Sequence, residues 1–496
     1  MCGFISVYAP DGHDVLEEIL DGLLAIQHRG QDAAGVVTWD GDKFHAKKGL
    51  GLVREVFSKK HAGRLKGHLG VGHVRYPTVG VGDDIDVQPF WIDFPVGVAM
   101  AHNGNVSNFQ DLKNKWFPER NVRLASDCDL EAVLYVFARS LFDQQNQAKA
   151  NGGSRTSAQV TPGDVWSAVR EVFATVKGAY SVVGMIAGHG MFAFRDPFGI
   201  KPIIMGERTT AEGTSYAVAS ESVVLDLSGY TGQRDLKAGE AIWIDSKQVV
   251  HSEVVGDKPH RPCIFEHVYF ARPDSLLDNI SVYKTRLRLG DAMAKAWQAT
   301  GIDVDVVIPV PESARSAAQS MAQALGVPCR EGLVKNRYVG RTFIMANTKE
   351  RRHSVRRKLN PIRLEFEGKR VLLLDDSIVR GNTARELVRM AREKGAKKVY
   401  LASYSPPLLH PCPYGIDMST KREFIARNHS TESLAAELGC DFLLYQDLAD
   451  MVECAQQGNP MIDRFCTACF DGNYPTGDIT GDLLDSIEEE RTRARV

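Results

Sequence analysis

The sequence lacks any long hydrophobic run and any strong excess of charge. No apolar stretch approaches the roughly 20 residues that a membrane-spanning helix needs, and the formal net charge is only −2. The N-terminus has neither a basic segment nor a long apolar core, so we expect no secretory signal peptide. These absences argue against a membrane protein and against a general nucleic-acid-binding protein. They predict a cytoplasmic location.

Disulfide bonds are also not expected, although the chain has nine cysteines. Their number is odd and they are scattered, and in a reducing compartment this pattern favours reactive thiols or metal ligands. The 496 residues are 44% hydrophobic and 25% charged, which is typical of a soluble globular protein. A chain of this length predicts two or three domains.

The most informative stretch is 371–385, V-L-L-L-D-D-S-I-V-R-G-N-T-A-R. Its unbroken apolar run predicts a strand buried on both faces, as in a parallel sheet. Asp375 and Asp376 then lie at the carboxyl end of that strand, where open α/β sheets bind ligands. Two acids at this position also occur as a solvated cap of a strand.

The turn that follows predicts a phosphate site. Gly381, Asn382 and Thr383 precede a helical pattern over 384–394. A helix start carries unpaired N–H groups and a partial positive charge, which favour a phosphate. Carboxylates about one turn from a phosphate cradle fit a sugar phosphate.

The whole pattern resembles the 5-phosphoribosyl-1-pyrophosphate (PRPP) signature of type I phosphoribosyltransferases. The resemblance implies that Asp375 and Asp376 hold the ribose hydroxyls and Mg²⁺. A second apolar run, 304–310, precedes Ser313, which matches a Mg²⁺-contacting position of that family and could also cap the next helix. The implied PRPP-binding residues are Asp375, Asp376, Ser377, Gly381, Asn382 and Thr383.

The other end of the chain offers a nucleophile. Cys2 becomes the N-terminal residue if Met1 is removed. Its α-amine would then titrate near pH 8, roughly, against about 8.5 for the thiol, so the amine can take the thiol proton without a histidine. By itself an incidental cysteine explains Met-Cys-Gly equally well.

Four further segments strengthen the nucleophile interpretation. They are His28–Asp32, Gly72–Thr78, His102–Asn105 and Ser126–Asp129. In order and spacing they resemble the N-terminal-nucleophile glutamine amidotransferase domain, an α/β/β/α sandwich.

That resemblance implies a role for individual residues. Cys2 would attack the side-chain amide of glutamine, and Asn103 with the N–H of Gly104 would form the oxyanion hole. Arg75 would hold the α-carboxylate of glutamine, for which its planar fork is suited, and Asp127 would pair with the α-ammonium. Taken singly, these residues also fit a hairpin turn, a surface charge and a helix N-cap.

Residues 335–358 contain nine Lys or Arg and one Glu. Such a run is usually a solvated face, and a nucleic-acid patch is a further alternative. We favour a loop that closes over PRPP, because the leaving pyrophosphate needs cationic stabilisation and exclusion of water.

Four dispersed cysteines predict a metal centre. Cys466 and Cys469 form a C-x2-C pair, with Cys412 and Cys263 upstream. Spacing alone leaves zinc and a [4Fe–4S] cluster open. The positions match the cluster-bearing branch of the glutamine PRPP amidotransferase family, which implies a structural [4Fe–4S] cluster.

The resemblance covers almost the whole chain. It implies a glutaminase sandwich over 2–245, a type I phosphoribosyltransferase parallel-sheet domain over 260–470 and a tail over 471–496. The implied reaction converts PRPP, glutamine and water into 5-phosphoribosylamine, glutamate and pyrophosphate, the first committed step of purine synthesis. The family also implies a homotetramer and feedback inhibition by purine nucleotides. Alternatives are a hexosamine-phosphate synthase and a PRPP-binding regulator with a vestigial glutaminase domain.

Overall fold

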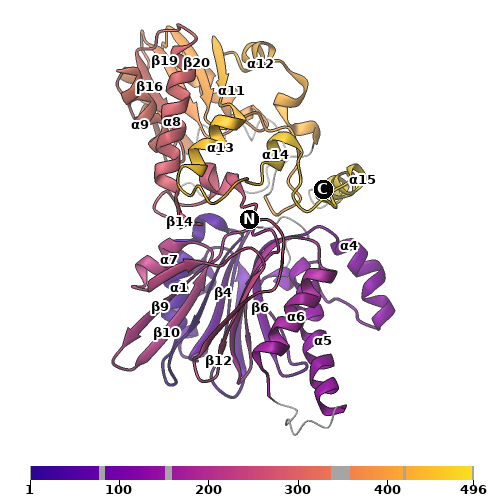
Figure 1. Ribbon diagram of the computed structural model, residues 1–496. Helices are drawn as coiled ribbons and strands as arrows, with labels where there is room; N and C mark the ends of the chain where they lie inside the picture. The colour runs from indigo at the N-terminus through magenta and orange to yellow at the C-terminus, as the bar shows by residue number, and fades with distance from the viewer. Residues whose placement is uncertain (1, 77–83, 151–158, 337–357, 417–420, 494–496) are drawn as a thin grey trace.

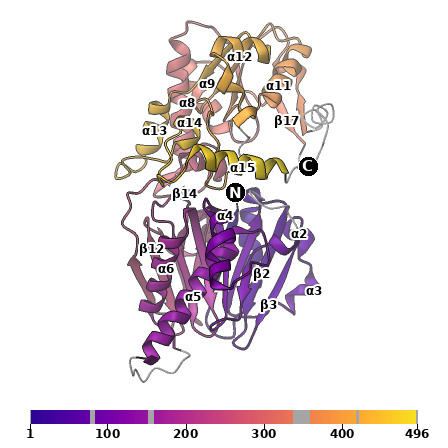
Figure 2. The same ribbon diagram turned by 90° about the vertical axis from the view of Figure 1, so that its right-hand side faces the viewer.

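The computed structural model describes residues 2–76, 84–150, 159–336, 358–416 and 421–493. They form an N-terminal half and a C-terminal half that lie one above the other in both views (Figures 1 and 2). The boundary between the halves is called the seam, and the N-terminal end of the chain lies there. None of the helices in these ranges combines the length and apolar character needed to cross a membrane.

The first half contains two antiparallel sheets that pack face to face. The seven-stranded sheet has the order β11 (Thr231–Asp235), β9 (Ile204–Thr210), β10 (Gly213–Ala219), β1 (Gly3–Tyr8), β4 (Leu69–Arg75), β2 (Ala33–Trp39), β3 (Phe44–Leu50). The six-stranded sheet has the order β13 (Val250–Val254), β12 (Glu240–Asp245), β8 (Gly190–Arg195), β7 (Gly178–Ile186), β6 (Val98–Val106), β5 (Phe90–Ile92). Because β13 pairs with β12, the second sheet continues past residue 245.

Alternation along each strand divides the core of this half into three layers. In β1, Phe4 packs between the two sheets, whereas Ile5 and Val7 face the helices. Helices α1 (Leu16–Ala25) and α7 (Ser222–Leu227) cover the first sheet. Helices α5 (Asp129–Ala150) and α6 (Pro162–Thr175) cover the second. The layers are therefore α/β/β/α, as predicted.

The second half is built on a parallel sheet. Its order is β16 (Val306–Pro309), β19 (Arg370–Asp375), β20 (Lys398–Ser403), β21 (Phe442–Tyr445). Leu372 and Leu374 face helices α8 (Val282–Gln298), α9 (Arg315–Leu325) and α13 (Leu448–Gln456). Val371 and Leu373 face α11 (Asn382–Glu393) and α12 (Thr431–Leu438). The predicted strand is thus buried on both faces, and the predicted fold class is confirmed.

Shorter elements complete the fold. Hairpin β14–β15 (Leu276–Leu277 and Ile280–Ser281) lies at the seam. The pair β17–β18 (Leu333–Lys335 and Leu359–Pro361) brings together the two ends of the basic segment. Helix α15 (Gly481–Arg493) runs along the seam in Figure 2. Just before it, Asp478 accepts a hydrogen bond from Ser107 Oγ at 3.1 Å.

Candidate functional site

The predicted nucleophile is buried beside the predicted oxyanion residue. Cys2 immediately precedes β1 and is 6% exposed. Its backbone nitrogen donates to Asn103 Oδ1 at 3.2 Å, and its Sγ donates to the carbonyl of Tyr76 at 3.8 Å. The Nδ2 of Asn103 is buried and finds no acceptor among the described residues. A buried donor that is left unpaired costs free energy, so this amide is poised for a group that is not part of the protein.

Close packing holds the neighbour of Asn103 in place. A Cβ on Gly104 would lie 2.1 Å from the carbonyl oxygen of Ala179 on β7, so only glycine allows the two strands to approach so closely. From the second half of the chain, Gly415 packs against the Gly104 carbonyl, and a Cβ there would lie 2.6 Å from it. Asn105 Nδ2 also donates to the carbonyl of Pro413 at 2.9 Å. The second half therefore contacts the oxyanion strand directly.

The two residues predicted to bind the ends of glutamine have different surroundings. Arg75 ends β4, is 4% exposed and forms an ion pair with the buried Asp86 at 3.6 Å. Asp127 is exposed, and its carboxylate pairs with Lys113. The backbone N–H of Asp127 donates to Asp86 Oδ1 at 3.1 Å, so Asp86 links the two predicted residues. Cys128, the next residue in this motif, is buried.

The second site is a cavity of about 1320 Å³ at the carboxyl end of the parallel sheet. It is lined by all the predicted PRPP-binding residues, by Ser313 and by basic side chains that include Arg286, Arg380 and Lys335. The Nζ of Lys335 lies 3.5 Å from Glu312 Oε2. The predicted closing loop over 335–358 falls almost entirely outside the described residues, so its closure stays a prediction.

Asp375 and Asp376 form a buried pair at the end of β19. Burial and the charge of Asp376 raise the pKa of Asp375 well above its usual range. Burial also raises the pKa of Asp376, partly offset by hydrogen bonds from Ser313 Oγ and from Ser377 Oγ, the latter at 2.6 Å. Two adjacent buried carboxylates are the donor set that a hard cation such as Mg²⁺ prefers.

The predicted phosphate cradle has the expected local geometry. Gly381 has φ +71° and is the N-cap of α11, which begins at Asn382. Its left-handed backbone favours glycine, and the Cβ of another residue would lie 2.4 Å from Ile425 Cδ1. The first turn of α11 therefore begins at the wall of the cavity, which Asn382 and Thr383 line.

The glutaminase half also contributes to the wall of this cavity. Leu24, Ala25, His28 and Tyr76 line it together with the residues of the second half. The carbonyl that accepts from the Cys2 thiol belongs to Tyr76. One residue thus joins the two predicted reaction centres.

The four predicted metal ligands converge, although they are far apart in the sequence. Cys263 and Cys466 face each other in an isolated parallel bridge. The carbonyl of Cys469 accepts from the backbone N–H groups of Leu409 and His410 at 3.0 and 3.1 Å, which brings it near Cys412.

All four thiols are buried. Burial raises the pKa of Cys263 to about 12 and the pKa values of Cys466 and Cys469 well above their usual range, and neighbouring cysteines add to these shifts. Within the described residues, no three His, Cys, Asp or Glu side chains are gathered tightly enough to hold one metal ion.

Several residues at the seam were not anticipated from the sequence. Arg29 is fully buried and pairs with Glu221 and, at 2.7 Å, with Glu266 of the second half. Arg29 belongs to the motif His28–Asp32, but its partners lie about 190 and 240 positions away. Local patterns carry no signal for such pairs.

Comparison with known proteins identifies both halves. A glutamine amidotransferase domain family matches residues 73–226, and a phosphoribosyl transferase domain family matches residues 280–404. The chain is 46% identical over 497 residues to an amidophosphoribosyltransferase of Pseudomonas aeruginosa, covering 100% of this chain and 97% of that protein. It is 43% identical over 498 residues to that of Escherichia coli, covering 99% and 96%.

Solved structures agree. The glutamine PRPP amidotransferase from B. subtilis, complexed with ADP and GMP, superposes with a TM-score of 0.83 at 36% identity and covers 97% of this chain and 98% of that one. A structure described as the allosteric regulatory enzyme of purine biosynthesis superposes with a TM-score of 0.84 at 35% identity and covers 99% of both. Since relatives of this identity match along essentially its whole length, the chain belongs to the amidophosphoribosyltransferase family of glutamine-dependent phosphoribosyl-transferring enzymes.

Proposed function

We propose that the chain makes 5-phosphoribosylamine, glutamate and pyrophosphate from PRPP, glutamine and water, the first committed step of purine synthesis. A glutaminase domain over 2–245 would supply ammonia to a phosphoribosyltransferase domain over 260–470, followed by a tail over 471–496. The observation that carries the proposal is Tyr76, which contacts the Cys2 thiol and lines the cavity that contains Asp375 and Asp376. An ammonia molecule released at Cys2 would therefore be delivered beside the acceptor.

In the first half-reaction, Cys2 Sγ attacks the side-chain amide carbon of glutamine. The developing oxyanion accepts hydrogen bonds from the unpartnered Nδ2 of Asn103 and from the N–H of Gly104. The C–N bond breaks and ammonia leaves with the proton that the thiol gave up. Water then hydrolyses the thioester and glutamate is released. Arg75 and Asp127 would bind the α-carboxylate and α-ammonium of glutamine.

In the second half-reaction, the ammonia nitrogen attacks the anomeric carbon of PRPP and the bond to pyrophosphate breaks. Asp375 and Asp376 orient the ribose hydroxyls, and the start of α11 holds the 5′-phosphate. Ser313, Asp375 and Asp376 are the residues that would hold Mg²⁺, which when bound neutralises charge on the leaving pyrophosphate. The raised pKa values of the two buried carboxylates fit such a cation.

The direct test mixes purified protein with glutamine, PRPP and Mg²⁺ and follows glutamate and pyrophosphate. We expect equal amounts of the two products and none of the pyrophosphate when PRPP is omitted. If the protein binds PRPP but releases neither glutamate nor pyrophosphate, it would instead be a regulator with a vestigial glutaminase domain.

We also propose that Cys263, Cys412, Cys466 and Cys469 hold a [4Fe–4S] cluster. Support comes from the burial of all four cysteines and from the neighbouring Cys412, Cys263 and Cys466, whose charges add to the effect of burial in raising the pKa of Cys469. Burial raises the pKa of Cys263 and Cys466, and the charge of the fully buried Lys201 offsets part of this rise. Anaerobically purified protein should be brown and contain about four irons per chain. Colourless protein with one zinc per chain would overturn this assignment.

The family resemblance further supports a cytoplasmic homotetramer inhibited by purine nucleotides. The B. subtilis relative binds ADP and GMP, which makes these two nucleotides the first to test. Light scattering on the purified protein measures the oligomer, and product formation at rising GMP measures inhibition. A monomer, or activity unaffected by either nucleotide, would contradict the respective proposal.

A further inference from the structure

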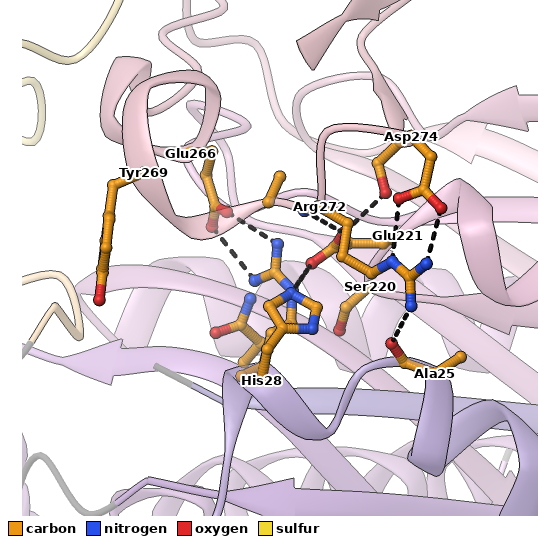
Figure 3. Close-up of polar contacts among 12 residues, drawn as sticks. Ala25, His28, Ser220, Glu221, Glu266, Tyr269, Arg272 and Asp274 are labelled. Carbon is orange, nitrogen blue, oxygen red and sulfur yellow. Dashed lines mark hydrogen bonds and ion pairs between the residues drawn. The ribbon is translucent and has the colours of Figure 1, made fainter. Parts of the chain in front are cut away.

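A single buried carboxylate joins the two halves of the molecule. Glu221 lies between β10 and α7 and is fully buried. Its Oε1 accepts from His28 Nε2 at 2.8 Å and from Arg29 Nε, both in the glutaminase half. Its Oε2 accepts from the backbone N–H of Arg272 at 2.9 Å and from Ser275 Oγ at 2.7 Å. One oxygen therefore serves each half, as Figure 3 shows for His28 and Arg272.

The charge of Glu221 is retained in this buried place. Burial alone would raise its pKa, but the charges of Arg29 and His28 lower it below the usual range, and hydrogen bonds from His28 and Ser275 add to this. Loss of any of these hydrogen bonds would be costly, because a buried carboxylate has no water to replace a missing donor. Its four donors are thus held at fixed positions relative to one another.

On the glutaminase side, these contacts reach the nucleophile. The side chain of Arg29 packs against the residue after Cys2, since a Cβ on Gly3 would lie 3.1 Å from Arg29 Cδ. Ser220, which precedes Glu221, accepts the backbone N–H of Phe4 at 3.0 Å. A shift of Glu221 would therefore move the first residues of β1.

On the other side, the contacts reach the wall of the PRPP cavity. Arg272 and Asp274 line that cavity and pair with each other at 2.7 Å. Arg272 Nη1 also donates to the carbonyl of Ala25 at 3.1 Å. His28 lines the cavity as well. A ligand that displaces or orders this wall acts on a segment that is anchored to Glu221 (Figure 3).

We propose that Glu221 is a positioning residue that couples occupancy of the PRPP cavity to the rate of glutamine hydrolysis at Cys2. The proposal rests on the two-site function described above. Glu221 is fully buried, so it would act through Arg29 and His28 on one side and through Arg272 and Ser275 on the other. A purely structural ion pair would contribute to stability but would leave the response of glutaminase to PRPP unchanged.

The test is the ratio of glutamate release with PRPP to glutamate release without it, measured on the full-length protein. In Glu221→Gln one of the two oxygens becomes an N–H₂ group, which cannot accept from the pair of donors that it faces, whereas the remaining oxygen can accept from the other pair. We expect the ratio to fall about tenfold, within the range of known coupling between sites. Synthesis with ammonium in place of glutamine should change much less.

Ser275→Ala removes one of the two hydrogen bonds that the second half donates to Glu221 and leaves the charge of Glu221 paired with Arg29, so it keeps the question answerable if Glu221→Gln folds poorly. It should lower the ratio in the same direction by a smaller factor. The matched control is Glu240→Gln, because Glu240 is a buried carboxylate that pairs with Arg234 and Ser252 inside the glutaminase half. Its ratio should equal that of the wild type.

The unfolding temperature of each variant is measured, and the assay temperature is set well below the lowest of them. A wild-type ratio of one, or an unchanged ratio in both Glu221→Gln and Ser275→Ala, overturns the coupling while leaving the two-site function intact. Failure of the wild type to form pyrophosphate and glutamate would instead refute the function itself.

Discussion

The clearest quantitative prediction concerns the unpaired amide of Asn103. In Asn103→Ala, kcat for glutamine hydrolysis should fall by about 10²–10³-fold, because one preorganised oxyanion donor supplies about 2.7–4 kcal/mol in the transition state. The KM for glutamine should change little, since Nδ2 is reserved for charge that develops only during the reaction. The structural basis is that Nδ2 is buried and has no hydrogen-bond partner among the residues that the structure describes.

The same geometry predicts that stability changes little. The alanine variant loses the hydrogen bond from the Cys2 nitrogen to Asn103 Oδ1, which contributes about 0.5–1.5 kcal/mol. It also removes a buried unpaired donor, whose presence costs about 1–3 kcal/mol. Because the two effects oppose each other, we expect the free energy of unfolding to change by no more than about 2 kcal/mol.

Three measurements check the prediction of a catalytic loss without a stability loss. They are glutamate release at saturating glutamine, pyrophosphate release with ammonium as the nitrogen source, and thermal unfolding. Asn105→Ala is the matched control, because Asn105 is a buried amide on the same strand and face whose Nδ2 donates to Pro413. It should keep glutaminase kcat within a few-fold of the wild type.

Two results would refute the oxyanion assignment. One is an Asn103→Ala variant that keeps more than about a tenth of the wild-type kcat, against the expected loss of about 10²–10³-fold. The other is an equal loss of glutamine-dependent and ammonium-dependent synthesis, which would mean that the substitution damages both sites.

Three further predictions address other parts of the molecule. Cys2→Ala should abolish glutamine use and keep ammonium-dependent synthesis, and loss of both activities would show that the halves do not act separately. Gly415→Ala should lower glutaminase kcat more than ammonium-dependent synthesis, because Gly415 has φ +91° and its new Cβ would lie 2.6 Å from the Gly104 carbonyl. A variant with the glutaminase kcat of the wild type would contradict this role of the contact. Burial raises the pKa of Asp235 to about 7 from 3.8, and the neighbouring charge of Asp278 adds to this. The folded state therefore holds a proton that the unfolded chain releases, and stability falls as pH rises between these values, by about 1.4 kcal/mol per unit. Asp235→Asn should consequently unfold at a higher temperature than the wild type at pH 8 but not at pH 4, whereas a gain that is independent of pH would contradict the assignment.

The sequence by itself determined the local elements around the second site. The run Val371–Leu374 predicted a doubly buried strand, and the structure has β19 over Arg370–Asp375. The helix predicted over 384–394 is α11 over Asn382–Glu393. These features are local, because side-chain period and turn residues act over a few positions.

Only the tertiary structure decided how the two reaction centres face each other. The motifs indicated a nucleophile at Cys2 and a cradle at Asp375, but not that Tyr76 borders both. Nor did they indicate that Glu221 shares its two oxygens between the halves. The physical reason is that a buried carboxylate is stable only where donors surround it. The donors to Glu221 come from segments about 190 and 50 residues away, so no local sequence pattern predicts them.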